Sequence, residues 1–282
     1  MRLFIFKLQS GGSFVKKWGV LCLAAWLAVF AAGCGTAAKA EKEDAVLKVG
    51  VTAGPHAEIL EQVKKVAEKQ GLKLQIVEFN DYVQPNAALD QGEIDANAYQ
   101  HKPFLDNHVK DRGYKLVSVA KTVILPMGIY SSKIKNLNEL KEGAVVAVPN
   151  DPTNGGRALL LLAKSGLITL REGSGIQATA LDIVANPKQL KIKELEAAQI
   201  PRSMDDVDAA AINTSYALKA GLVPSRDGVA VEDSSSPYTN VIAVRQKDKD
   251  DPRFRKLIAA YQSEEVKAFL AEHFKGSILP AW

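Results

Sequence analysis

Cysteine is nearly absent from this chain. Only Cys22 and Cys34 occur in its 282 residues, and we expect Cys22 to leave with an N-terminal signal. The remaining body then has no disulfide and no cysteine to bind a metal. An oxidising compartment would leave such a body chemically unchanged.

Groupings of catalytic or metal-binding residues are also lacking. The four histidines are His56, His101, His108 and His273. They are scattered without the spacing that a metal site needs. No Ser-His-Asp, Cys-His or Gly-x-Ser-x-Gly arrangement stands out. The sequence therefore predicts a protein that is not an enzyme and that holds no metal and no cofactor.

An excess of positive charge is absent once the first residues are set aside. Residues 1–33 contain four basic residues and no acidic one. Without them, the 36 basic residues of the chain fall to 32, which equals the number of acidic residues. Nucleic-acid binding requires a basic face. We therefore expect no nucleic-acid partner, and we expect a monomer.

The N-terminus contains a short apolar run, Val20–Ala32, that follows Lys16-Lys17 and ends at Gly33-Cys34. A basic start, a short apolar stretch and small residues before a cleavage point are typical of a secretory signal. The cysteine directly after that point resembles a bacterial lipobox, although Ala31 stands where leucine is usual. The sequence predicts a lipoprotein signal peptide at 1–33, read from Met1 or from an alternative start at Val15.

A lipobox cysteine carries a diacylglycerol, so we expect acyl chains such as palmitate on Cys34. Two or more chains hold a protein on a membrane far longer than one. The protein would then be anchored on the extracytoplasmic face of the cell membrane, with residues 34–45 as a flexible tether. The alternatives are an ordinary signal peptide or a membrane-spanning helix, for which the apolar run falls short of the ~20 residues required.

The rest of the chain alternates strand-like and helix-like segments. Strands are predicted at 47–51, 72–77, 94–99, 144–148 and 207–212. Helices are predicted at 59–70, 83–91, 137–141, 157–164, 252–261 and 263–274. This alternation indicates an α/β fold in which mixed, mainly parallel sheets are flanked by helices.

The pattern restarts after residue 125, which indicates two lobes with a ligand cleft between them. We expect lobe 1 to comprise residues 46–125 and 239–282, and lobe 2 to comprise 126–238. Ligands of such sheets bind at the carboxyl ends of the strands.

The segment 149–157, Pro-Asn-Asp-Pro-Thr-Asn-Gly-Gly-Arg, joins a predicted buried strand to a helix. Free N–H groups at a helix start, two glycines that let a ligand approach, and Arg157 together would make an anion site. No Gly-Lys-Ser/Thr follows, so the segment is not a P-loop. The alternative is a capped helix start with Arg157 facing solvent.

Polar and aromatic side chains end another predicted strand, at 95–103. Strand alternation would point Asn97, Tyr99 and His101 to one side. Aromatic walls suit an apolar or sulfur-bearing ligand, because thioethers pack well against rings. Either ring could instead be a hydrogen-bonded core residue.

Two asparagines, Asn213 and Asn240, lie just after or just before predicted strands. A side-chain amide in such a place can accept a hydrogen bond from an ammonium group. Either asparagine could equally form a turn.

Several motifs together resemble those of the methionine-binding lipoproteins of bacterial ABC importers, the NlpA/MetQ family. The motifs are VGVTAGPH (49–56), FNDYVQPN (79–86), DANAYQHKPFL (95–105), PNDPTNGGRAL (149–159), AINTSYA (211–217) and YTNVI (238–242). The resemblance covers the chain from Leu47 to Trp282.

The resemblance implies a two-lobed, periplasmic-binding-protein-like fold that closes on L-methionine and delivers it to the permease and ATPase of an importer. It implies that Arg157 holds the ligand carboxylate and that Asn213 and Asn240 hold the carboxylate and ammonium ends. It implies that Tyr82, Tyr99 and His101 line the thioether pocket. Hinges are expected at 123–127 and before Asn240.

Three alternatives remain from the sequence alone. The ligand could be D-methionine, a methionine-containing dipeptide or another small amino acid. The chain could be a secreted hydrolase, or a surface adhesin that uses the fold as a scaffold.

Overall fold

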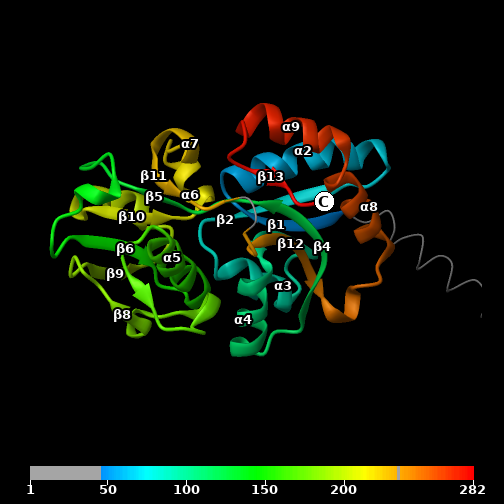
Figure 1. Ribbon diagram of the computed structural model, residues 1–282. Helices are drawn as coiled ribbons and strands as arrows, with labels where there is room; N and C mark the ends of the chain where they lie inside the picture. Colours follow the sequence, from blue (N-terminus) through cyan, green and yellow to red (C-terminus); the bar gives the residue numbers. More distant parts are fainter. Residues whose placement is uncertain (1–45, 234–235) are drawn as a thin grey trace, which may run out of the picture. The chain divides into compact units, whose positions relative to one another are not determined.

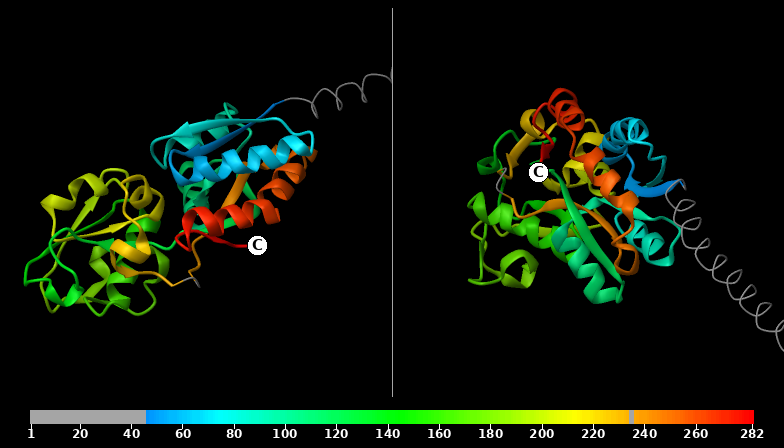
Figure 2. Two further views of the ribbon diagram at one scale, coloured as in Figure 1. Left: turned by 90° about the horizontal axis from the view of Figure 1, so that it is seen from above. Right: turned by 90° about the vertical axis from the view of Figure 1, so that its right-hand side faces the viewer.

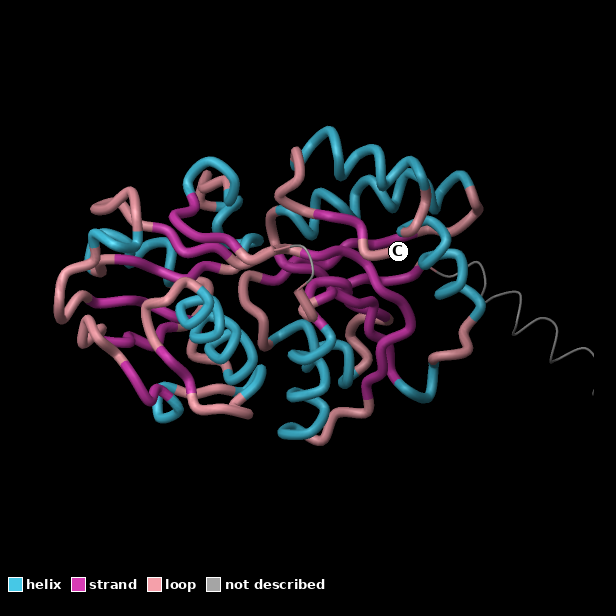
Figure 3. The backbone as a smooth tube through the Cα atoms, viewed as in Figure 1, coloured by secondary structure: helices cyan, strands magenta, loops and turns pink. Residues whose placement is uncertain are grey.

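The computed structural model describes residues 46–233 and 236–282. The predicted signal peptide, Cys34 and the tether lie outside the described residues. The described strands form two main sheets, each with its own hydrophobic core, and we call the two halves the first and second lobes. Figure 3 shows the strands gathered in these two groups.

The first lobe is built on a six-stranded sheet of order β13-β4-β12-β3-β1-β2. Its strands are β1 (Leu47–Thr52), β2 (Leu74–Phe79), β3 (Ala96–His101), β4 (Leu116–Ile124), β12 (Thr239–Arg245) and β13 (Leu279–Pro280). Its helices are α2 (Pro55–Lys69), α3 (Gln84–Gln91), α4 (Lys102–Arg112), α8 (Pro252–Tyr261) and α9 (Glu264–Phe274). Helices α2, α8 and α9 cover one face of the sheet, and α3 and α4 cover the other (Figure 1).

Helix α2 illustrates how the sequence builds this lobe. Pro55 occupies the first turn, where a missing N–H costs nothing, and Gly71 takes the left-handed conformation just beyond the end. Ile59, Val63 and Val66 recur at helical spacing and are buried against the sheet. Burying each such side chain stabilises the fold by about 1.5–3 kcal/mol.

The second lobe is built on a five-stranded sheet of order β11-β5-β10-β6-β9. Its strands are β5 (Gly128–Tyr130), β6 (Val145–Pro149), β9 (Lys191–Leu195), β10 (Ala209–Ile212) and β11 (Gly228–Val231), with a separate pair β7 (Thr169–Leu170) and β8 (Ile183–Ala185). Its helices are α5 (Pro152–Lys164), α6 (Thr214–Lys219) and α7 (Pro224–Asp227). Short 3-10 turns are η1 (Leu137–Glu139), η2 (Gly175–Gln177), η3 (Ala180–Asp182) and η4 (Ile200–Asp206), and η5 (Gln246–Asp248) follows β12 in the first lobe.

The α/β class is confirmed, but the parallel share of the sheets is smaller than the sequence predicted. In the first sheet β1 pairs parallel with β2 and β3, whereas the pairs formed by β12 and β13 are antiparallel. In the second sheet β6 is parallel to β9 and β10, and β5 is antiparallel to both of its neighbours. Strands β5 and β12 each follow a crossing between the lobes, and β13 lies at an edge of its sheet. These three strands run antiparallel to their neighbours.

The chain crosses between the two sheets at 125–127, from β4 to β5, and again between β11 and β12. Figure 2 shows the segment from β4 to β5 running between the two strand groups. The backbone N–H of Glu232 donates to the carbonyl oxygen of Met127 over 2.9 Å. The two crossings are therefore bonded to each other.

Some element predictions were wrong. The predicted helix at 137–141 is only the 3-10 turn η1, and the helix predicted from Arg157 begins at Pro152. Strands β4, β5, β7, β8, β9, β11 and β13 and helices α4, α6 and α7 were not predicted. Strand β9, for example, is an edge strand with charged, exposed positions, so its sequence resembles a loop. In the described ranges, no helix combines the length and the apolar character needed to cross a membrane.

Candidate functional site

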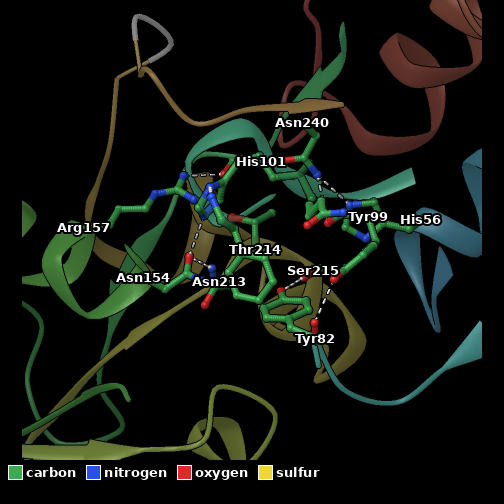
Figure 4. A pocket seen from close by; sticks show the side chains of 13 residues that line it. His56, Tyr82, Tyr99, His101, Asn154, Arg157, Asn213, Thr214, Ser215 and Asn240 are labelled. Atoms are coloured by element: carbon green, nitrogen blue, oxygen red, sulfur yellow. Dashed lines mark hydrogen bonds between the residues drawn. The ribbon is translucent and has the colours of Figure 1, made fainter. Parts of the chain in front are cut away.

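A narrow cavity of about 30 Å³ lies among residues contributed by both lobes. The six residues that were expected to bind the ligand all line it: Tyr82, Tyr99, His101, Arg157, Asn213 and Asn240. His56, Gln100, Phe104, Leu125, Asn154, Thr214 and Ser215 complete the lining. Figure 4 shows Arg157 and Asn213 toward one end and Asn240 and His56 toward the other. Clefts lined by aromatic side chains and a few polar groups are typical of small-molecule sites.

Arg157, on α5, is buried rather than facing solvent, with 3 % of its surface exposed. Its Nε and Nη2 donate to the two carboxylate oxygens of Glu232 over 2.8 and 2.5 Å, and Nη2 also donates to the carbonyl oxygen of Leu125 over 2.8 Å. The guanidinium carbon lies 4.4 Å from the centroid of the Tyr238 ring. The remaining nitrogen, Nη1, makes no hydrogen bond to any described residue and is free for a ligand.

The start of α5 is not the open anion site that the sequence suggested. The carboxylate of Asp151 caps the helix by accepting from the backbone N–H of Asn154 over 2.9 Å. A β-carbon on Gly156 would lie 2.5 Å from the carbonyl oxygen of Ile176, and one on Gly155 would lie 2.8 Å from that of Pro149. The two glycines therefore permit close backbone packing, and the prediction that they admit a ligand was wrong.

His101 holds a defined tautomer in this site. Its Nδ1 accepts from the backbone N–H of Phe104 over 3.1 Å, so Nε2 carries the proton and donates to Oδ1 of Asn154 over 3.1 Å. Burial, followed by the charge of Arg157, lowers the pKa of His101 to about 3, so the ring is neutral. Because His101 and Asn154 belong to different lobes, this bond joins the two sides of the cavity.

Asn213 is oriented by the side-chain oxygen of Asn154, which also accepts from His101. Its Nδ2 donates to Oδ1 of Asn154 over 2.7 Å. Its own Oδ1 is buried and has no hydrogen-bond partner. Since a buried, unpaired acceptor costs about 1–3 kcal/mol, this oxygen favours a ligand that donates a hydrogen bond.

Asn240 presents a second acceptor. Its Nδ2 donates to the carbonyl oxygen of Tyr99 over 3.1 Å and to Nε2 of His56 over 3.0 Å. His56 in turn donates from Nδ1 to the hydroxyl of Thr52 over 2.9 Å, and burial lowers its pKa to about 4. Oδ1 of Asn240 makes no hydrogen bond to the described residues. Asn240 lies within β12 rather than before it, which corrects the prediction from sequence.

Aromatic rings form the apolar wall of the cavity. Tyr82 lies 6.0 Å from Tyr99 and 6.1 Å from Phe104 between ring centroids. The hydroxyl of Tyr99 donates to the carbonyl oxygen of Tyr82 over 2.8 Å. The hydroxyls of Tyr82 and Ser215 are hydrogen-bonded over 2.5 Å and so connect the two lobes. Burial raises the pKa of both tyrosines, which therefore stay neutral.

A bulge in β3 changes which side chains reach the cavity. Two steps along β12, from Val241 to Ala243, pair with three steps along β3, from Gln100 back to Asn97. The extra residue breaks the regular alternation of the strand.

Asn97 does not line the cavity, and the register places it on the opposite side of the strand from His101, so its predicted alignment with His101 was wrong. It belongs to a buried amide cluster in which Gln100 donates to Asn97 over 2.8 Å and to Asn86 over 2.6 Å. Asn97 also donates to Asn86 over 2.9 Å. This cluster ties β3 to the start of α3, directly after the loop that carries Tyr82.

Sequence reasoning missed three functional candidates: His56, Asn154 and Glu232. His56 and Asn154 lie inside the motifs at 49–56 and 149–159, so the motifs alone could have indicated them. Within the described residues, no group of three or more His, Cys, Asp or Glu residues could hold a metal ion.

The model of the NlpA lipoprotein family matches residues 47–282. The chain belongs to this family. It is 55 % identical over 254 residues to the D-methionine-binding lipoprotein MetQ of Salmonella typhimurium, covering 89 % of this chain and 93 % of that one. It is 53 % identical over 253 residues to the protein of the same name from Escherichia coli K12, covering 89 % and 92 %.

Solved structures agree with this family membership. A nutrient-binding protein from Burkholderia cenocepacia bound to methionine is 57 % identical, with a TM-score of 0.82, covering 84 % of this chain and all of that one. The methionine-binding protein MetQ is 53 % identical, with a TM-score of 0.82 and coverage of 84 % and 98 %. The two-lobed α/β fold expected from the sequence is confirmed by these members of the family.

Proposed function

We propose that this protein is the substrate-binding component of an ABC importer and that it binds one methionine molecule between its lobes. The observation that carries the proposal is a pairing of unsatisfied groups within one cavity. Nη1 of Arg157 is a free cationic donor, and Oδ1 of Asn213 is a buried acceptor without a partner. A free amino acid has a carboxylate for the first group and an ammonium for the second.

The aromatic wall supports a thioether side chain. Sulfur contacts with aromatic rings contribute about 0.3–1.5 kcal/mol. Tyr82, Tyr99 and Phe104 present such rings, and His101 is neutral and adds no charge to the wall. In this proposal Arg157 binds the ligand carboxylate, the two asparagines bind its polar ends, and the rings together with His101 bind the side chain.

Binding would favour the closed arrangement of the lobes. A ligand shifts such an equilibrium only by its difference in affinity for the two states. The bonds from His101 to Asn154 and from Tyr82 to Ser215 run between the lobes beside the cavity. A ligand that contacts both sides adds to these bonds only when the lobes are closed.

Membership of a lipoprotein family supports the remaining parts of the proposal. These are cleavage after Gly33, lipidation of Cys34, an extracytoplasmic membrane location and delivery of the ligand to a permease and ATPase. The role is transport rather than catalysis. Mass spectrometry of the membrane-extracted chain should find acyl groups on Cys34, and Cys34→Ala should release the protein from the membrane.

Calorimetry would test the ligand. The full chain, purified in mild detergent, is unfolded and refolded to remove any carried ligand and then titrated with L-methionine and D-methionine. We expect sub-micromolar, one-to-one binding of L-methionine. Stronger binding of D-methionine would match the names of the relatives and change the stereochemical assignment. A folded sample that binds neither enantiomer nor a methionine dipeptide would contradict the proposal.

A further inference from the structure

Glu232 is the one acidic residue bonded to the cavity-lining arginine within the described part of the chain. Its carboxylate accepts from Nε and Nη2 of Arg157, and its Oε2 also accepts from the backbone N–H of Met127 over 2.9 Å. The side chain of Glu232 is 12 % exposed and that of Arg157 is 4 % exposed. The carboxylate is therefore fixed by three donors and cannot swing away without breaking all of them.

We infer that Glu232 selects the charge of the ligand: by neutralising Arg157, it makes the cavity favour an uncharged or zwitterionic ligand over an anion of the same shape. The inference rests on the proposed function and concerns how the same site discriminates among ligands. It assigns a specificity-determining role to a residue outside the cavity lining.

The hydrogen-bond geometry limits what Arg157 offers. Two nitrogens of its guanidinium are already bonded to Glu232, and Nη2 also serves Leu125. Only Nη1 remains, so a ligand carboxylate cannot obtain the two-pronged grip that a free guanidinium provides. The site therefore holds a carboxylate through a single nitrogen of a charge-neutral pair.

The other groups around the cavity add no positive charge. His56 and His101 are neutral, and so are Tyr82 and Tyr99. The carboxylate of Asp151 lies just behind Asn154 and accepts from its Nδ2 over 2.9 Å. A ligand anion would bring further negative charge into a buried region that has no unpaired positive charge to balance it. Burying such an unbalanced charge is costly.

A ligand that also carries an ammonium group avoids this cost, because the ammonium charge balances that of its own carboxylate. The ammonium would lie within reach of the unpaired side-chain oxygen of Asn213, which is an acceptor and attracts a cationic donor. A hydroxy acid of the same shape places a neutral hydroxyl there and leaves its carboxylate uncompensated.

Three probes of almost equal shape separate these charges. They are methionine, with no net charge; its 2-hydroxy analogue, an anion; and methioninol, a cation without a carboxylate. We would measure their affinities by calorimetry for the refolded full chain, for Glu232→Gln and for Asp233→Asn. Asp233 is a matched control because it is the next residue, pairs with Lys164 at the surface and is 52 % exposed.

Glu232→Gln should improve binding of the hydroxy acid relative to methionine by about tenfold or more, since a unit charge a few ångströms away is removed from a partly desolvated site. The same change should weaken methioninol relative to methionine. Asp233→Asn should leave both ratios within about twofold, because solvent screens its charge. A merely positioning role for Glu232 would instead weaken both carboxylate ligands equally.

Two results would overturn the inference. One is an unchanged hydroxy-acid to methionine ratio in a Glu232→Gln protein that still melts cooperatively. The other, which needs no variant, is equal affinity of the wild-type protein for methionine and its hydroxy analogue. A folded wild-type protein that binds neither methionine enantiomer nor a methionine dipeptide would contradict the proposed function itself, and this outcome differs from the two results above.

Discussion

Nδ2 of Asn213 donates to Oδ1 of Asn154 over 2.7 Å, and this bond decides which end of the Asn213 amide is left free. Asn154 cannot reverse its own amide, because its Nδ2 donates to both carboxylate oxygens of Asp151. The orientation of an oxygen that lines the cavity is thus fixed by a capped helix start.

Asn154→Leu should weaken methionine binding by about 1–3 kcal/mol, the cost of leaving buried polar groups without partners. The change keeps the approximate size of the side chain while removing the acceptor shared by His101 and Asn213. Calorimetry measures the loss. The control is Asn138→Leu, which alters an exposed asparagine of η1. Equal affinities for Asn154→Leu and the wild type would show that the orientation of Asn213 is set elsewhere.

Arg157→Ala should weaken binding by about 2–5 kcal/mol, the usual effect of removing one partner of a buried charged pair. It should also lower the free energy of unfolding by about 3–5 kcal/mol, because Glu232 is left buried and unpaired.

The double variant Arg157→Ala/Glu232→Gln separates these two effects. It should recover part of the lost unfolding free energy, measured by urea denaturation, without recovering affinity. Lys164→Ala, on the same helix but exposed, serves as the control. Unchanged affinity in Arg157→Ala would refute its role in binding.

Tyr82→Phe should weaken binding by about 0.5–1.5 kcal/mol, the net value of a typical hydrogen bond. The variant keeps the aromatic wall and removes only the bond to Ser215 between the lobes. A double-mutant cycle with Ser215→Ala should give a coupling energy of similar size. A coupling energy of zero in the ligand affinity would mean that this bond makes no difference to closure.

Stability should decrease as the pH falls below about 6.5, the unfolded pKa of histidine. The folded pKa values of His56 and His101 are lowered to about 4 and about 3, so the unfolded state takes up protons first. Each histidine should cost about 1.4 kcal/mol per pH unit in the window between its unfolded and folded pKa values.

Urea denaturation at a series of pH values measures this slope. His101→Gln should reduce it, whereas Asn138→Leu, at an exposed side chain that does not titrate, should not. A flat profile for the wild type through this window would contradict the buried, neutral state of both rings.

Gly156→Ala should destabilise the fold by about 1–3 kcal/mol through overpacking. The new methyl group would meet backbone atoms of Ile176 and Ala178 at 2.5 and 3.0 Å, and backbone yields little. Gly173→Ala, with open space around it but a φ of +80°, should cost less. Thermal denaturation compares the two variants, and a Gly156→Ala protein as stable as the wild type would mean that the 175–178 segment moves freely.

Much of the site could be predicted because its residues lie in compact motifs at strand ends. Tyr99 and His101 end a predicted strand, Arg157 follows the turn after the apolar run 144–148, and the motifs supplied Tyr82. Glu232 could not be predicted in this way, because the residues directly after it in the sequence are polar and its partner is 75 residues away. Nothing local distinguishes it from a solvated loop residue.

The β3 bulge escaped prediction for a different reason. The segment 96–101 contains no glycine and no proline, which are the usual local signs of an irregular strand. Its extra residue is seen only in the pairing with β12, which lies about 140 residues further along the chain. The mixed sheets escaped prediction for a similar reason. The sequence pattern of a single strand does not show whether its neighbours in the sheet run parallel or antiparallel to it.

The bonds between the two crossings have a mechanical consequence. Glu232 is tied to Met127 by its backbone N–H and by its carboxylate, and Arg157 is tied to Leu125. Two connecting segments that are hydrogen-bonded to each other act as a single hinge. They permit the lobes to rotate about one common axis, while they resist twisting and sliding of one lobe against the other. The lobes should therefore return to the same relative orientation each time they close.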